Sequence, residues 1–457
     1  MKKKLLTLLL FVIPMLTFAQ EKGIDQQIDE AFKPVSDFIS GIIFFTIGGT
    51  PFVLILLVGS AAFFTIYFGF PNFRFFGKAI NVVRGKYDHL DQHTSGDPAL
   101  AVDGDVKGTI KDESEEGEVT HFQALATAVS GTVGNGNIAG VALAIALGGP
   151  GATFWMIICG LLGMSTKFVE CTLGVQYRDV GEDGTIYGGP MYYITKGLKE
   201  KGFATLGKIA AALFAVFCIG GSFGGGNAAQ SNQATIVLKE LIGLESTGAG
   251  FWIGVILAVL VGIIIIGGIK RIASVTEKVV PFMAVMYLVA CLYIILSNFS
   301  LIDDAVSLIM TEAFNPKAIG VGGVIGVLLV GFKRAAFSNE AGAGSASIAH
   351  SAVKTKYSAS EGLVALLEPF IDTVVICSMT ALVIIIFNFG GSFEYGGDGT
   401  GGVFIDGVRL EGAGITSAAF AEYIPYSNVF LTIAVVLFAV STMISWSYYG
   451  LQSWKFL

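Results

Sequence analysis

The sequence predicts an all-α polytopic membrane protein, and three observations support this fold class. The mean hydropathy is +0.72, and 53% of the 457 residues are hydrophobic while only 14% are charged. Such a composition leaves too little polar surface to cover a water-soluble protein. Nine apolar stretches are long enough to cross a bilayer, which takes about 20 helical residues. Short glycine-rich breaks interrupt two of these stretches.

The nine stretches follow one another with polar connections between them. They lie near 39–70, 124–148, 151–176, 208–238, 250–269, 279–297, 318–350, 362–388 and 428–450. Residues 39–457 are therefore expected to form one transmembrane domain. The five cysteines fall in or beside the stretches without metal-type spacing, so we expect them to be ordinary core residues.

The chain begins with a pattern that is typical of a secretory signal. Three lysines are followed by an apolar run from Leu5 to Phe18 and by the small residue Ala19. We expect residues 1–20 to form a cleavable signal peptide, with a short uncleaved anchor as the alternative. After cleavage the mature N-terminus, residues 21–38, would lie outside, and the first span would run inward.

The distribution of lysine and arginine agrees with that orientation. Most of these residues fall in the loops that it places inside, and the outer loops after the first span hold only Lys239, Lys317 and Arg409. This imbalance is the positive-inside rule, to which acidic residues contribute little. The sequence therefore predicts a multi-pass protein of a bacterial-type inner (plasma) membrane with its mature N-terminus outside.

Three long connections have distinct patterns. The inner loop 71–121 opens with mixed bulky and basic residues, which predicts an interfacial helix, and continues into an acidic insertion at 88–118 for which we have no functional account. The inner connection 181–208 is aromatic as well as polar and is expected to contain a short helix. The outer loop 389–427 is glycine-rich, and its alternating piece 403–410 indicates a hairpin.

The two breaks point to a binding site. Residues 131–140 read GTVGNGNIAG in the second span, and residues 338–347 read SNEAGAGSAS in the seventh. Backbone that leaves the helix at membrane depth is tolerated only where protein encloses it or where it lines a cavity. The breaks lie five spans apart and enter from opposite sides. This arrangement predicts a five-plus-five inverted repeat.

The chemistry of the first break suits a small zwitterion. Glycine tolerates the non-helical angles of unwinding. The N–H groups at the start of a half-helix suit a carboxylate, and exposed carbonyls suit Na⁺ or an ammonium group. Thr132, Asn135 and Asn137 add side-chain dipoles without net charge. The alternative interpretation is a helix face of small residues that packs closely against a neighbour.

Three stretches resemble the signature sequences of the alanine-or-glycine:cation symporters, the sodium:alanine symporter family. They are TAVSGTVGNGNIAGVA at 127–142, KRAAFSNEAGAGSA at 333–346 and STMISWSYYG at 441–450. The resemblance covers most of the chain from about residue 39. It implies the leucine-transporter fold and Na⁺-driven uptake of alanine or glycine.

The resemblance also implies a set of site residues. Substrate contacts are expected from the first break at Thr132, Gly134, Asn135, Gly136 and Asn137, and from the second at Phe337, Ser338, Asn339 and Gly342. In folds of this kind a sodium ion lies between the first broken helix and hydroxyls of the eighth core helix. The corresponding residues here are Gly131, Gly134, Ser441, Thr442 and Ser445. Hard oxygen ligands suit this cation, although a hydroxyl in a span commonly bonds its own helix carbonyl instead.

Other polar residues in the spans are candidates from their chemistry. In the fourth span Asn227 and Gln230 are expected to face the cavity, or else to form interhelical hydrogen bonds. Trp446 is expected to close the pocket, with packing as its alternative role. Ionisable residues within spans are costly and are functional candidates by default.

Three carboxylates are candidates for coupling or gating. Glu340 in the second break could orient the backbone, coordinate a cation or carry a proton, with an internal salt bridge as the alternative. Glu368 and Asp372 share one helical face and indicate a gate or a packing network. Lys167 and Glu170 are expected to form an inner-face charge cluster, and His350 to be interfacial.

A sodium-coupled symporter that imports a small neutral amino acid, alanine or glycine, by alternating access explains these features together. The rival is a proton-coupled carrier that uses Glu340. Four histidines without a catalytic or metal pattern make an enzyme improbable, and a channel would need no alternating access. The expected partners are the amino acid, the co-transported Na⁺ and the lipid bilayer, without nucleic acid. A complete repeat would need two more helices after the ninth span, so we expect a fragment truncated after nine spans.

Overall fold

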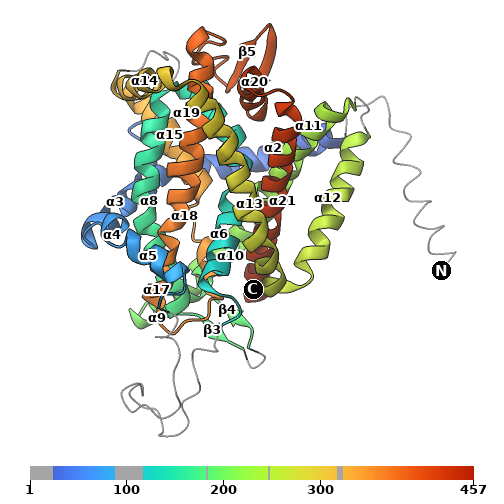
Figure 1. Ribbon diagram of the computed structural model, residues 1–457. Coiled ribbons are helices and arrows are strands. Elements are labelled where there is room, and N and C mark those ends of the chain that lie inside the picture. Colours follow the sequence, from blue (N-terminus) through green and yellow to red (C-terminus); the bar gives the residue numbers. More distant parts are fainter. Residues whose placement is uncertain (1–23, 88–116, 182–183, 245–247, 316–322) are drawn as a thin grey trace, which may run out of the picture. The chain divides into compact units, whose positions relative to one another are not determined.

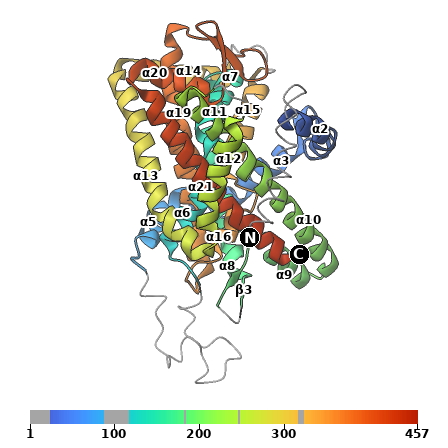
Figure 2. The same ribbon diagram turned by 90° about the vertical axis from the view of Figure 1, so that its right-hand side faces the viewer.

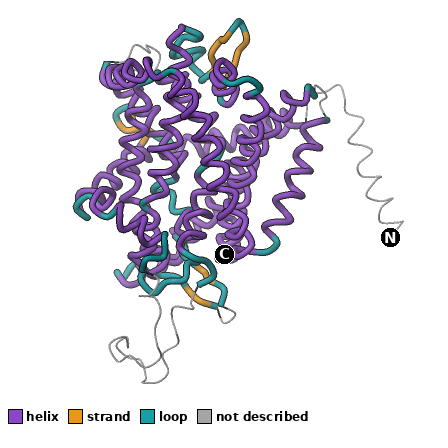
Figure 3. Tube along the Cα trace, viewed as in Figure 1, coloured by secondary structure: helices purple, strands orange, loops and turns teal. Residues whose placement is uncertain are grey.

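The computed structural model describes residues 24–87, 117–181, 184–244, 248–315 and 323–457, and most of these residues are helical (Figure 3). The signal peptide expected at 1–20 lies outside the described residues. So does the acidic insertion expected at 88–118, apart from its last two residues.

The chain divides after Leu56 into two compact units. The described part of the first unit contains helix α2 (Ile24–Ile43), a hairpin of β1 (Thr46–Ile47) and β2 (Thr50–Pro51), and the start of α3 (Phe52–Tyr67). The stretch expected at 39–70 is therefore not one helix. Gly48 and Gly49 take φ values of 60° and 82° in the hairpin turn, where the chain reverses before α3 begins.

The second unit is a helical assembly. Its helices are α4 (Pro71–Arg74), α5 (Phe76–Val83), α6 (His121–Thr132), α7 (Val141–Gly148), α8 (Gly151–Gln176), α9 (Pro190–Glu200), α10 (Ala204–Phe223), α11 (Ala229–Ile242), α12 (Ala249–Ile265), α13 (Gly268–Ser297), α14 (Ile302–Phe314), α15 (Gly323–Asn339), α16 (Ala346–His350), α17 (Ser358–Ala365), α18 (Leu367–Pro369), α19 (Ser378–Phe387), α20 (Ala413–Tyr423) and α21 (Ser427–Phe456).

Short hairpins and wide turns complete the second unit. Strand β3 (Asp179–Val180) pairs with β4 (Ile186–Tyr187), and β5 (Gly402–Ile405) pairs with β6 (Val408–Glu411). The β5–β6 hairpin coincides with the alternating piece at 403–410, which confirms the hairpin expected there. Helices α4 and α5 occupy the start of the expected inner loop, and α9 occupies the connection 181–208. Wide π-type turns lie at Gly136–Gly140, Gly224–Ala228 and Phe370–Cys377.

Length and composition identify five helical segments of the described chain that could each cross a membrane. They are Gly151–Gln176, Ala204–Ile242, Gly268–Ser297, Ser358–Gly390 and Ser427–Phe456. The bent pair His121–Thr132 and Gly136–Gly148 makes a sixth. The nine expected stretches thus do not all become long helices, because α3, α12 and α15 have only 16, 17 and 17 residues. The chain is nevertheless a multi-pass membrane protein by its apolar helices.

Three helices of the second unit, α6, α8 and α21, make many of its helix–helix contacts. Helix α8 packs against α15 and α17, α6 against α13, and α21 against α10, α11 and α13. Figures 1 and 2 show α8 beside α15, and α13 beside α21. Large apolar side chains remain exposed on α10, α12 and α13, for example Phe217, Ile256 and Phe282. A surface of this kind suits lipid rather than water.

Candidate functional site

The first break is an unwound turn followed by a wide helical turn. Helix α6 starts with a capping box between Thr120 and Gln123 and ends at Thr132, after which Val133 takes the extended angles φ −74° and ψ 93°. The Gly136–Gly140 turn then leads into α7, and the two helical parts are bent by 53°. The unwound backbone at 133–134 lies inside the segment predicted from the sequence.

The second break is more strongly unwound than the first. Helix α15 ends at Asn339, and α16 starts at Ala346. Between them Glu340, Gly342 and Gly344 have φ values of 54°, 93° and 82°. Left-handed backbone is natural for glycine and uncommon for glutamate, so Glu340 is held there by its surroundings. This break also lies within its predicted range.

Asp372 links the two breaks. Its Oδ1 accepts hydrogen bonds from Asn137 Nδ2 at 2.6 Å and from the Ser338 hydroxyl at 3.1 Å. The neighbouring Thr373 hydroxyl donates to Oδ2 at 2.7 Å. Asn137 also accepts the Gly134 N–H at 2.9 Å, so one hydrogen-bond chain runs from the first break to the second. Asp372 comes from a helix 235 residues away from Asn137 in sequence.

Helix α21 lies against the first break. The Ser130 hydroxyl donates to the Ser441 carbonyl at 2.7 Å, and the Ser445 hydroxyl donates to the Thr127 carbonyl at 2.8 Å. The Ser441 hydroxyl bonds the Phe438 carbonyl of its own helix at 3.2 Å. Ser441 and Ser445 thus have their polar groups satisfied by backbone.

Two buried hydroxyls of α21 face the same glycines without a hydrogen-bond partner among the described residues. They belong to Thr442 and Tyr449. A Cβ on Gly134 would lie 2.5 Å from Thr442 Oγ1, and one on Gly131 would lie 3.0 Å from the Tyr449 hydroxyl. Glycine at 134 therefore makes room for the Thr442 hydroxyl. Of the residues predicted for sodium, Gly134 thus faces Thr442 and Gly131 faces Ser445.

The polar stripe of the fourth span reaches the first break through one residue. Gln230 Oε1 accepts the Asn135 N–H at 3.2 Å. Asn227 instead donates to the Ser222 carbonyl at 2.7 Å, within its own helical segment. Asn135 Oδ1 is buried and has no partner within the described chain. Gln230 thus contacts the break, whereas Asn227 bonds its own helical backbone, within a wide turn.

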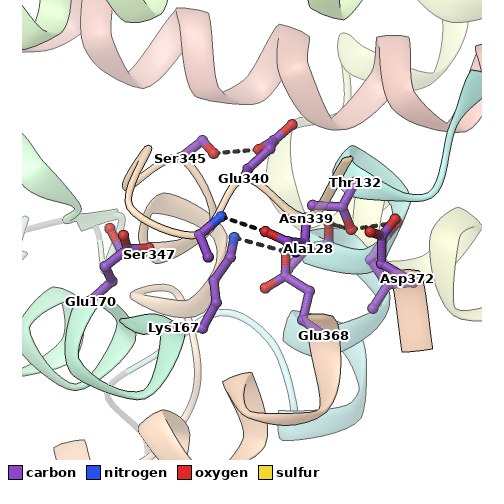
Figure 4. Close-up of polar contacts among 12 residues, drawn as sticks. Ala128, Thr132, Lys167, Glu170, Asn339, Glu340, Ser345, Ser347, Glu368 and Asp372 are labelled. Carbon is purple, nitrogen blue, oxygen red and sulfur yellow. Dashed lines mark hydrogen bonds and ion pairs between the residues drawn. The ribbon is translucent and has the colours of Figure 1, made fainter. Parts of the chain in front are cut away.

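The remaining predicted contacts fall into three environments. The Thr132 hydroxyl bonds back to Ala128 and Val129 carbonyls of its own helix, the alternative noted for such hydroxyls (Figure 4). Asn339 donates to Thr373 at 3.0 Å and accepts the Ala341 N–H at 3.0 Å. A Cβ on Gly136 would lie 3.9 Å from both Phe337 and Ser338, so these residues border the first break.

Glu340 joins the second break to α21. Its carboxylate accepts a hydrogen bond from the Ser345 hydroxyl (Figure 4) and one from Trp446 Nε1 at 2.9 Å. Glu340 forms no ion pair with any described residue, so the salt bridge considered from the sequence is absent from this part of the chain. Trp446 packs on Gly226, where a Cβ would lie 2.4 Å from its Cβ.

Glu368 and Asp372, the two candidates for a gate or a packing network, contact different partners. Lys167 Nζ lies 3.1 Å from Glu368 Oε1, and both side chains are fully buried (Figure 4). His350 is also fully buried: its Nδ1 lies 2.5 Å from Glu361, and its Nε2 lies 3.7 Å from Glu368. Glu361 also pairs with His121. Lys167 and His350 are thus buried within the protein, where both face the carboxylate of Glu368.

Glu170 supports the second break in a way that the sequence did not reveal. Its Oε1 accepts the Gly342 N–H at 2.6 Å, which satisfies a backbone donor that the unwinding leaves open. The residues are 172 positions apart. A carboxylate within an apolar span was the only available signal, and it did not identify the partner.

Comparison with known proteins supports the same assignment as the sequence motifs. The model of the sodium:alanine symporter family matches residues 29–457. The sodium/alanine symporter AgcS of Methanococcus maripaludis is 38% identical over 408 residues, which cover 89% of this chain and 81% of that protein.

Two proteins of Bacillus subtilis are also similar. YrbD, described as a putative sodium/proton-dependent alanine carrier protein, is 40% identical over 74% of this chain and 67% of its own length. GlnT, described as a probable sodium/glutamine symporter, is 35% identical over 74% of this chain and 66% of its own length. The chain belongs to the sodium:alanine symporter family, whose members are membrane transporters rather than enzymes.

Proposed function

We propose that the protein is a Na⁺-coupled symporter that imports a small neutral amino acid, alanine or glycine, by alternating access. The observation that carries this proposal is the buried, unpartnered hydroxyl of Thr442 facing Gly134 in the first break. An unsatisfied buried hydroxyl costs about 1–3 kcal/mol, and an alkali cation is a ligand that would satisfy it. The family assignment supports Na⁺ as that cation.

The sodium site would use the facing segments of α6 and α21. Thr442 would contribute its hydroxyl, and the backbone around Gly131 and Gly134 would contribute carbonyl oxygens. Ser441 and Ser445 already bond carbonyls of α6 or of their own helix, so they hold α21 in place and could exchange these partners for the ion. Oxygen ligands of this kind suit a hard cation.

The amino acid would bind between the two breaks. Unwound backbone beside Thr132, Asn135 and Gly136 suits the carboxylate and the ammonium group. Asn137 of the first break and Ser338 of the second would lie beside this site, and both donate hydrogen bonds to Asp372. Because Asp372 links the two breaks, it is a stronger candidate for a gate than Glu368.

Bulky and amide side chains would complete the substrate site. Trp446 would limit its size. Gln230 would lie beside the first break, with Asn227 on the same helical segment, and the second break would contribute Phe337, Asn339 and Gly342. Relatives described as alanine and as glutamine carriers indicate that substrate size is a property that varies among similar proteins.

The proposed transport cycle follows from a leucine-transporter-like five-plus-five repeat with one extra N-terminal span and the mature N-terminus outside. Na⁺ binding at α6 and α21 would favour the outward-open state, and rocking of one helix group would release both solutes inside. Opposite polarity of the two breaks supports this arrangement.

Transport into proteoliposomes tests the function. Labelled alanine should accumulate when an inward Na⁺ gradient is imposed at equal pH, and should not when choline replaces Na⁺. Unlabelled glycine, serine and glutamine added as competitors rank the substrates. Absence of alanine accumulation under a Na⁺ gradient, with the protein folded and inserted, would reject the proposal.

Proton coupling through Glu340 is the second candidate. The observation that favours it is the position of Glu340, which has a left-handed backbone conformation in the second break and whose carboxylate also contacts α21. In addition, one relative is described as sodium/proton-dependent. Glu340→Gln keeps an acceptor oxygen for Trp446 Nε1 and places an amide donor beside the Ser345 hydroxyl, which can accept, but it cannot release a proton. Uptake that persists in this variant under a Na⁺ gradient excludes the proton route, whereas selective loss of pH-driven uptake supports it.

A further inference from the structure

Arg334 on α15 carries a charge that the described protein does not neutralise. Its Nε and Nη2 atoms are buried and have no hydrogen-bond partner, and no described carboxylate lies within ion-pair distance. An uncompensated charge in a membrane protein interior is expensive, and arginine in a span is a functional candidate for that reason. Within the described residues, the guanidinium therefore keeps two buried donors that an anionic ligand could bind.

The guanidinium lies on the first break. A Cβ on Gly140 would lie 2.2 Å from Arg334 Cζ and 2.3 Å from Nη1, so only glycine leaves room for it. A Cβ on Gly136 would lie 3.5 Å from Nη2. Gly136 and Gly140, which were expected to allow the helix to unwind, thus also leave space for the Arg334 side chain.

Packing fixes the orientation of the guanidinium. Its Cζ lies 4.6 Å from the centre of the Phe337 ring, a cation–π contact that holds the planar group against one face. The two unpartnered donors, Nε and Nη2, are the pair that points in a common direction along one edge of a guanidinium. This edge is the fork that binds a carboxylate through two parallel hydrogen bonds.

The acidic groups of the protein near this edge are already engaged. Asp372 is the described carboxylate whose charge favours the Arg334 cation. Both oxygens of Asp372 accept hydrogen bonds from Asn137, Ser338 and Thr373. Asp372 thus lowers the cost of the cation without occupying its fork.

We propose that Arg334 binds the α-carboxylate of the amino acid and makes the transporter select amino acids over the corresponding amides and amines. The proposal rests on the proposed function, because it assigns a specificity-determining residue to the same site. Backbone N–H groups of the first break and the guanidinium would then share the two carboxylate oxygens, with the ammonium group left to the carbonyls.

Alanine and alaninamide separate this role from a structural one. They share the side chain and the ammonium group, and only alanine has a carboxylate. Inhibition of Na⁺-driven labelled alanine uptake by each compound gives a selectivity ratio. We expect Arg334→Gln to lower the ratio at least tenfold, chiefly through weaker alanine binding, and Arg334→Lys to lower it less, since a lysine keeps the charge but lacks the fork.

Lys333→Gln is the matched control, because it removes one exposed positive charge from the neighbouring position. It should leave the ratio unchanged. A ratio that stays constant in both Arg334 variants, or that falls equally in Lys333→Gln, would overturn the proposal. Should Arg334→Gln fail to fold, Arg334→Lys decides the question. If wild-type protein shows no Na⁺-dependent alanine uptake, the proposed function fails instead, so the two failures are distinguishable.

Discussion

At the scale of single residues, the first break is shaped by what lies opposite each glycine. Gly134 faces the Thr442 hydroxyl, Gly131 faces Tyr449, and Gly140 faces the Arg334 guanidinium. Each of these opposing groups is buried and lacks at least one hydrogen-bond partner in the described chain. Small residues therefore bring polar atoms close to the unwound backbone without filling the space between them.

Thr442→Val should separate ion binding from stability. Valine has nearly the shape of threonine, and the hydroxyl that it removes has no partner to lose. We expect an unchanged unfolding temperature without Na⁺, and loss of most of the stabilisation that Na⁺ gives the wild-type protein. Thermal unfolding in detergent, with NaCl or choline chloride, measures both. Ser447→Ala is the control, because that hydroxyl bonds the Met443 carbonyl of its own helix; equal Na⁺ shifts in wild type and Thr442→Val would contradict the assignment.

Gly134→Ala and Gly136→Ala form a matched pair. The added Cβ meets Thr442 Oγ1 at 2.5 Å in the first variant, whereas its nearest neighbour in the second is Arg334 Nη2 at 3.5 Å. Overpacking costs about 1–3 kcal/mol, so Gly134→Ala should lower stability and abolish Na⁺-dependent uptake. Gly136→Ala should fold normally. Unfolding temperatures and uptake rates of the two variants check this. A larger loss of stability and uptake in Gly136→Ala than in Gly134→Ala would contradict the contact between position 134 and Thr442.

At the scale of elements, both breaks were predictable and their partners were not. Glycine runs with asparagine inside an apolar stretch identify where a helix must unwind, and the structure unwinds within both predicted ranges. The groups that hold the breaks come from far along the chain: Asp372 for Asn137 and Glu170 for Gly342. Local pattern carries no information about such tertiary contacts, so the spacing of Glu368 and Asp372 did not reveal that their partners differ.

The buried pair of Lys167 and Glu368 gives an element-scale prediction, because it links α8 to α18. Removing one partner of a buried ion pair leaves an uncompensated charge and typically costs about 3–5 kcal/mol. Lys167→Met should therefore lower the unfolding temperature strongly. Glu368→Gln combined with Lys167→Met should recover a large part of the loss. If the double variant were as unstable as the sum of the single ones, the pair would not be coupled in the protein.

The outer β5–β6 hairpin gives a pH prediction. Hydrogen bonds from the Thr400 hydroxyl and N–H, and from Arg409, hold the pKa of Asp398 well below its usual range. Because the pKa of Asp398 is lower in the folded hairpin than in the unfolded chain, where it is near 3.9, ionisation of Asp398 stabilises the hairpin at pH values above about 3.9. This stabilisation is lost as the pH falls through the pKa of the folded state. Hydrogen exchange of the hairpin amides should stay slow at pH 4.

Asp398→Asn should speed that exchange at neutral pH, because the charge-assisted bonds to Arg409 are lost. Asp406→Asn at the hairpin turn is the control, since the described structure gives Asp406 no such bonds, and it should leave exchange unchanged. Rapid exchange in the wild-type hairpin already at pH 5 would contradict the assigned role of Asp398.

At the scale of the whole molecule, composition and lysine and arginine distribution were enough to predict a helical multi-pass membrane protein. The count of spans was less predictable, because apolar stretches include the turns that connect helices. Residues 39–70 contain a glycine hairpin, and α12 and α15 are shorter than their stretches. Family membership follows from three motifs in order, and the Na⁺ and amino-acid sites remain proposals that the geometry of α6, α15 and α21 supports.

The central claim is that Na⁺ and the amino acid bind as a coupled pair at the first break. Equilibrium binding of labelled alanine to the purified protein in NaCl and in choline chloride tests it most directly, because coupling between two ligands is reciprocal. The account predicts at least tenfold tighter alanine binding in NaCl for the wild-type protein, and little difference between the two salts for Thr442→Val. Equal alanine affinity of the wild-type protein in both salts would contradict it.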